Sequence, residues 1–146
     1  MKTQLTIILI KLLLLISLRA EASAEQEIVI VVNKNNPIEK VTHRQLIDMY
    51  MGKYLAFPNG HMAITLDYRK EHPLRSVFFK ALTGRSISQI NAYWSRVKFS
   101  GKASPPQAYP STEAIIDKVI TTPSAIAYLP ASAVTDELKV VYRFVQ

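Results

Sequence analysis

The sequence predicts one α/β domain with a mixed central sheet flanked by helices. Residues 27–32 are an apolar run rich in β-branched residues, which is typical of a buried strand. Several later stretches place apolar residues three and four positions apart, the spacing of an amphipathic helix. Strands interleaved with such helices indicate a layered α/β domain. Apolar residues make up 49% of the chain, which argues against disorder.

Residues 1–24 have the pattern of a secretory signal peptide. Lys2 gives a positive start, residues 12–18 are a short apolar run, and residues 22–24 are a small-residue cleavage site. Lys11 interrupts the apolar region, which disfavours a spanning helix of about 20 apolar residues. We expect cleavage and a periplasmic or secreted protein; retention as an N-terminal anchor is the alternative.

Cleavage after Ala24 leaves a mature domain over residues 25–146, long enough for a single hydrophobic core. The chain has a net charge of +7, and a basic excess favours anionic ligands or surfaces. It contains no cysteine, which excludes disulfides and thiolate chemistry.

The first half of the domain is expected to contain a strand, a helix and a second strand, in that order. After the strand at 27–32, Thr42 caps a helix that runs to about Met51. Residues 58–60 form a tight turn that leads into a strand over 62–68.

Two helices follow the second strand. Pro73 suits the first position of a helix over residues 73–83, and Gly84 suits its end. Ser86 or Ser88 begins the next helix, which closes near Gly101.

The last part of the domain is expected to hold one helix and two strands. Residues 104–110 contain three prolines and are predicted to be a loop. Ser111 then caps a helix that Pro123 stops. Short strands over 125–129 and 139–145 complete the domain.

Cationic side chains gather at the junction between the second strand and the second helix. Arg69, His72 and Arg75 flank the first helical turn, whose free N–H groups attract anions. An anion site is therefore predicted at this junction. In the alternative interpretation, Asp67 and Glu71 pair with these cations on a solvated turn.

Signatures of enzymes and of metal sites are missing from the sequence. It has no GxGxxG, P-loop or GxSxG motif, and the histidines lack metal-ligand spacing. Basic and aromatic residues mix in 92–102, but Trp94 falls on an inner helix face, so it is predicted to be structural. We expect no catalytic activity, no cofactor, no metal and no nucleic-acid partner.

Five segments in order resemble the small phosphate-transporter substrate-binding-like proteins of the type 2 periplasmic binding protein superfamily. The segments are NKNNP, LIDMYMGKYLAFPNG, DYRKEHPLRSVFFKALTG, YWSRVKFSGKASPP and TTPSAIAYLP. The most specific are the helix followed by MGK, an aromatic residue and PNG, and the TPSAIAYL block, which is similar to an NPGAIGYV pattern. The resemblance implies one lobe of a periplasmic-binding-protein fold.

In full-length members of that family an anion lies between two lobes, held by a Ser-Gly-Thr-type loop and an Arg at a helix N-terminus. The resemblance carries this role to one group of residues here: Arg69, His72, Arg75 and Ser76, with Ser111 and Thr112 as a second helix N-terminus facing the same cleft. Lys70 to Pro73 stand where the Ser-Gly-Thr loop is expected.

Two functions follow from these expectations. The first is an exported, non-catalytic binding module for phosphate or another small oxyanion, acting in phosphate uptake or sensing with an ABC transporter. The alternative is an interaction protein that keeps the fold without the ligand. Such a protein would dock on a membrane transporter, a sensor protein or another copy of itself.

Overall fold

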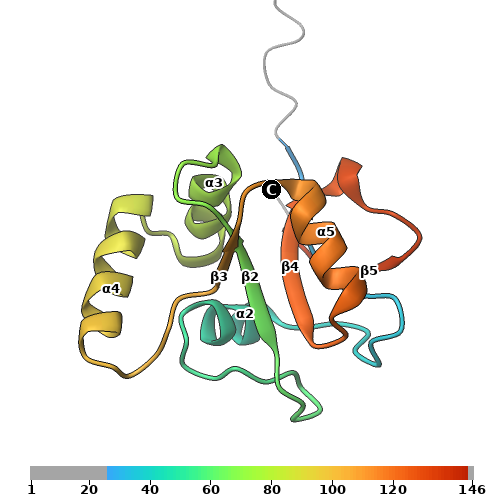
Figure 1. Cartoon of the computed structure of the whole chain (residues 1–146), viewed down its shortest axis with the longest axis horizontal. Coiled ribbons are helices and arrows are strands. Elements are labelled where there is room, and N and C mark those ends of the chain that lie inside the picture. The colour runs from blue at the N-terminus through green and yellow to red at the C-terminus, as the bar shows by residue number, and fades with distance from the viewer. Residues whose placement is uncertain (1–25, 145–146) are drawn as a thin grey trace, which may run out of the picture.

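The computed structural model describes residues 26–144, so the predicted signal peptide lies outside the described residues. The described part forms one five-stranded mixed sheet with strand order β3-β2-β4-β1-β5 (Figure 1). Its strands are β1 (Ile28–Asn33), β2 (Ile64–Tyr68), β3 (Gln107–Tyr109), β4 (Ala125–Pro130) and β5 (Leu138–Arg143). Strand β2 runs parallel to β3 and β4, whereas β1 is antiparallel to β4 and β5. The predicted mixed α/β fold is confirmed.

Within residues 26–144, four α-helices and one short 3-10 helix connect the strands. They are α2 (His43–Tyr50), α3 (Pro73–Thr83), α4 (Ile87–Phe99), α5 (Thr112–Thr121) and the 3-10 helix η1 (Ala131–Ala133). Figure 1 shows α5 lying along β4, and α4 on the side of the molecule away from β5. None of the helices in the described part is both long and apolar enough to cross a membrane.

Local signals set the helix boundaries as predicted. Thr42, Ser86 and Ser111 each cap a helix by accepting a backbone N–H in the first turn. Helix α3 begins at Pro73 and ends before Gly84, which has the left-handed φ of 72° that glycine adopts without strain.

One predicted loop is wrong in part. Residues 107–109 form the short strand β3, whereas the prolines of this segment had indicated irregular structure throughout. The prolines at 105, 106 and 110 all lie just outside the strand, so its three residues keep their N–H groups and pair with β2. The second strand is also shorter than predicted, because Met62 only forms an isolated bridge with Ala56.

An aromatic cluster joins α2 and α3 to the sheet. The rings of Phe78 and Tyr128 stack with centroids 3.7 Å apart, and Tyr50 packs edge-on against both. The Tyr50 hydroxyl lies 3.2 Å from the carbonyl oxygen of Leu66 and 3.3 Å from that of Ile126. This cluster packs the middle of α3, together with α2, against β2 and β4, next to the candidate site.

Candidate anion-binding site

Tyr68, the last residue of β2, joins the N-termini of α3 and α5. Its ring stacks on the ring of His72, which caps α3, with centroids 4.0 Å apart. Its hydroxyl lies 2.9 Å from Oγ1 of Thr112, the first residue of α5. Both helices follow parallel strands, so they begin at the same edge of the sheet. The structure therefore brings together the two helix starts on which the sequence placed the anion site.

The backbone N–H groups at the start of α3 are already engaged. Pro73 has no N–H, the Leu74 N–H donates to Nδ1 of His72 over 3.2 Å, and the Arg75 N–H donates to the His72 carbonyl oxygen. Since Nδ1 accepts this bond, a neutral His72 carries its proton on Nε2. At this turn, an anion can therefore accept a hydrogen bond from the His72 ring but not from the engaged backbone N–H groups.

The start of α5 holds a carboxylate of its own. Ser111 caps the helix by accepting the N–H of Ala114 over 3.2 Å. The exposed Glu113 carboxylate accepts hydrogen bonds from its own backbone N–H and from the Ser111 hydroxyl, and these bonds lower the pKa of Glu113. An anion arriving at this edge meets that negative charge.

Arg69 and Ser76 lie at the surface beside the same edge. Arg69 is exposed, and its backbone N–H donates to the carbonyl oxygen of Tyr109 over 2.9 Å, which fixes the chain directly after β2. The Ser76 hydroxyl donates to the Pro73 carbonyl oxygen over 2.9 Å, so its proton is occupied within the helix.

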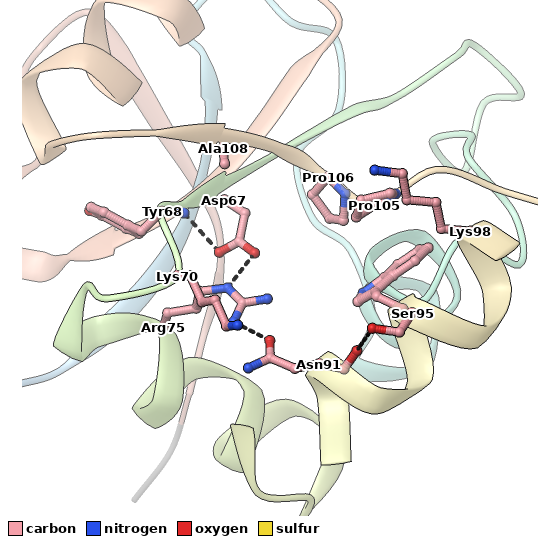
Figure 2. Close-up of a pocket in the computed structure, with 11 residues that line it drawn as sticks. Asp67, Tyr68, Lys70, Arg75, Asn91, Ser95, Lys98, Pro105, Pro106 and Ala108 are labelled. Atoms are coloured by element: carbon pink, nitrogen blue, oxygen red, sulfur yellow. Dashed lines mark hydrogen bonds and ion pairs between the residues drawn. The ribbon is translucent and has the colours of Figure 1, made fainter. Parts of the chain in front are cut away.

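Arg75 lies on the other side of the α3 start, in a buried ion pair (Figure 2). Its Nε lies 2.8 Å from Oδ2 of Asp67, and its Nη1 donates to Oδ1 of Asn91 on α4 over 2.8 Å. The guanidinium also lies 5.2 Å from the centre of the Phe79 ring. The structure therefore separates Arg75 from His72 and Thr112, with which the sequence had grouped it.

Asp67 accepts three hydrogen bonds in this buried position. Besides Arg75, the Tyr128 hydroxyl donates to its Oδ1 over 2.5 Å and the Tyr68 N–H over 2.7 Å. Burial raises the pKa of Asp67, while Arg75 and the other donors oppose that shift. Burial also raises the pKa of Tyr128, which keeps its hydroxyl protonated and able to donate.

Sequence reasoning missed Asn91 and Tyr128 as partners of this ion pair. Neither residue stands in a motif, and both reach Asp67 or Arg75 from other elements of the fold. Within residues 26–144, no three His, Cys, Asp or Glu side chains lie close enough together to hold a metal ion.

Three solved structures share this fold. The first is an ABC-type phosphate transport receptor from Vibrio cholerae, with 17% sequence identity and a TM-score of 0.62. The second, from Clostridium perfringens, is assigned as a phosphate ABC transporter substrate-binding protein and was solved with bound phosphate; its identity is 19% and its TM-score 0.62. The third, from Planctomyces limnophilus, is assigned as a phosphate-binding protein, with 12% identity and a TM-score of 0.55. No protein-family model matches the chain, and no curated protein matches its sequence.

Each match covers 79% of this chain but only 45%, 44% and 40% of the respective structures. The chain therefore spans less than half the length of the proteins that it resembles. These matches confirm, for the fold, the predicted likeness to phosphate-transporter substrate-binding proteins, and the covered share agrees with a single lobe.

Proposed function

We propose that this chain is an exported, non-catalytic solute-binding domain that binds phosphate or another small oxyanion in phosphate uptake or sensing. The observation that carries the proposal is the meeting of the α3 and α5 N-termini at Tyr68. A structure of the same fold with bound phosphate supports it. The matching transport receptor makes a membrane transporter the natural partner.

The ligand would lie on the sheet edge, between the starts of the two helices. Arg69 supplies the positive charge, His72 donates from Nε2, and the Thr112 hydroxyl adds a donor when the Tyr68 hydroxyl donates to it. The Ser111 hydroxyl stays bonded to Glu113 and contributes only to the start of α5. Arg75 contributes indirectly, because its ion pair with Asp67 holds the β2–α3 turn in place. The site is open to water, so its ligand stays partly solvated and binding by this domain alone is weak.

Calorimetric titration with phosphate, and in parallel with sulfate, tests this proposal. We expect saturable binding that the Arg69→Gln variant loses and the Arg85→Gln variant keeps. Arg85 is a matched control because it is also an exposed arginine but follows the C-terminal end of α3. An absence of heat up to ~10 mM phosphate, a Kd that corresponds to only about 3 kcal/mol, would contradict the proposal.

A second candidate function, docking on another protein, is favoured by one observation. The loop between α2 and β2 exposes three large apolar side chains: Tyr54 (63% exposed), Leu55 (44%) and Met62 (71%). A membrane transporter, a sensor protein or another copy of this chain could cover them. Analytical ultracentrifugation and cross-linking, compared between the protein and a Tyr54→Ser/Met62→Ser variant, test this function; a monomer without cross-linked partners contradicts it.

A further inference from the structure

A cavity of about 290 Å³ adjoins the buried Arg75–Asp67 ion pair (Figure 2). It lies between the end of β2, helix α4 and the proline-containing segment that precedes β3. Figure 2 shows the Asp67 side chain pointing toward Arg75 and the Tyr68 ring pointing away from both. Tyr68 borders both places, but Arg69, His72 and Thr112 do not line this cavity, so it is distinct from the candidate site on the sheet edge.

Two donors in the cavity wall lack an acceptor among residues 26–144, and one of them, Nε1 of Trp94, is fully buried. The Arg75 side chain is only 9% exposed, and its Nη2 has no hydrogen-bond partner among residues 26–144. Figure 2 shows this end of the guanidinium turned into the space beside Asn91 and Ser95. Nε1 of Trp94, which also lines the cavity, is buried and equally without a partner in the described part of the chain. A buried donor is normally paired, so the unpaired Nε1 of Trp94, together with the free end of the Arg75 guanidinium, makes this wall suited to a ligand that carries acceptor atoms.

The charges around the cavity favour an anion. Lys70 and Lys98 line its exposed rim, and together with Arg75 they outnumber the single carboxylate of Asp67. The opposite wall is apolar and includes Pro105 and Pro106. A ligand that satisfies both walls has a charged end and an apolar end.

We propose that this cavity binds a small organic acid, a monocarboxylate with an apolar substituent. Its carboxylate meets Nη2 of Arg75, and its apolar part packs against Pro105 and Pro106. A single negative charge fits better than two, because the Asp67 carboxylate lies in the same wall. The proposal is independent of phosphate binding at the sheet edge, since Arg69 and His72 do not line the cavity.

Trp94 makes the test direct because it is the only tryptophan of the chain. Phenylacetate is titrated while the single indole N–H signal is followed by NMR. We expect a saturable shift of that signal, with about fivefold weaker binding in Lys98→Gln, whose exposed charge contributes modestly. Lys40→Gln, an exposed lysine outside the cavity, serves as the matched control and leaves binding unchanged.

A second variant tests the role of Arg75 without leaving a buried charge unpaired. The double variant Asp67→Asn/Arg75→Gln removes both charges of the ion pair, and it is expected to lose phenylacetate binding while keeping a folded circular dichroism spectrum. If this double variant unfolds, the comparison of Lys98→Gln with Lys40→Gln still tests whether phenylacetate binds in the cavity.

Three results would overturn the proposal. They are the absence of a saturable indole shift at millimolar phenylacetate, an equal shift with uncharged phenylacetamide, and tighter binding of phenyl phosphate than of phenylacetate. Inorganic phosphate is titrated separately with the Arg69→Gln variant, so failure of the sheet-edge site is distinguished from failure of this one.

Discussion

Nε of Arg75 lies 2.8 Å from Oδ2 of Asp67, and the two side chains are 9% and 5% exposed. Each is bonded to a further element: Asn91 on α4 holds the guanidinium, and Tyr128 on β4 holds the carboxylate. This ion pair therefore ties β2, β4, α3 and α4 together beside the site.

Removing one charge of that pair should strongly destabilise the fold. We expect Arg75→Leu to lower the free energy of unfolding by about 3–5 kcal/mol, because it leaves the Asp67 carboxylate buried without its cation. Urea denaturation measures the change. The exposed pair Arg44–Asp48 is the control, and Arg44→Leu should cost less than about 1 kcal/mol. Equal losses in both variants would contradict the structural role of the buried pair.

Glu113 should titrate below the usual range of a glutamate, because its own N–H and the Ser111 hydroxyl stabilise its charged form. Its folded pKa is lowered, so its contribution to stability is present above the unfolded pKa and is lost as the pH falls through the folded pKa. NMR titration of the side-chain carboxyl carbon measures this pKa. Ser111→Ala should raise it; an unchanged value would contradict the assigned hydrogen bond.

The same carboxylate should oppose phosphate at the sheet edge. We expect Glu113→Gln to tighten phosphate binding roughly two- to fivefold, since water screens a like charge at an exposed site and leaves only a modest repulsion. Calorimetry at low ionic strength measures the change. Asp117→Gln, further along the same helix, is the control and should change the affinity less.

The hydroxyl of Tyr68 should matter more for the ligand than for the fold. Tyr68→Phe keeps the ring stacked on His72 but removes the bond to Thr112, at a cost of about 1 kcal/mol in unfolding free energy. Because α5 then loses this link to β2, we expect weaker phosphate binding in calorimetry. Unchanged affinity would show that the start of α5 takes no part in the site.

Gly52 should not tolerate a side chain. It has φ +68°, and a Cβ there would lie 2.8 Å from a carbon of the buried Trp94 ring. We expect Gly52→Ala to cost about 2–4 kcal/mol, the sum of backbone strain and a steric clash. Gly60→Ala is the control, since it shares the positive φ but has open space, so it should cost about 1–2 kcal/mol in urea denaturation.

The sequence predicted the elements of the fold better than the arrangement of the site. Helix α3 could be bounded at Pro73 and Thr83 because its cap, its first-turn proline and its terminal glycine are local signals. Strand β3 could not be predicted in this way, because it forms by pairing with β2, a neighbour that is distant in sequence.

The local sequence pattern also does not predict the direction in which each cationic side chain points. His72 and Arg75 are three residues apart at the start of one helix, yet His72 stacks on Tyr68 while Arg75 turns to Asp67 and Asn91. Which side each takes depends on the elements that pack around α3, and the sequence of this segment alone does not contain that information.

Strand β3 also affects how the molecule meets other copies of itself. It is the outermost strand on its side of the sheet, so its free edge carries unpaired N–H and C=O groups to which another chain could add a strand. The prolines at 105, 106 and 110 confine that edge to residues 107–109, and none of the three can donate a hydrogen bond. This short, proline-flanked edge is therefore a poor template for a strand of another copy, and we expect little edge-to-edge association on this side.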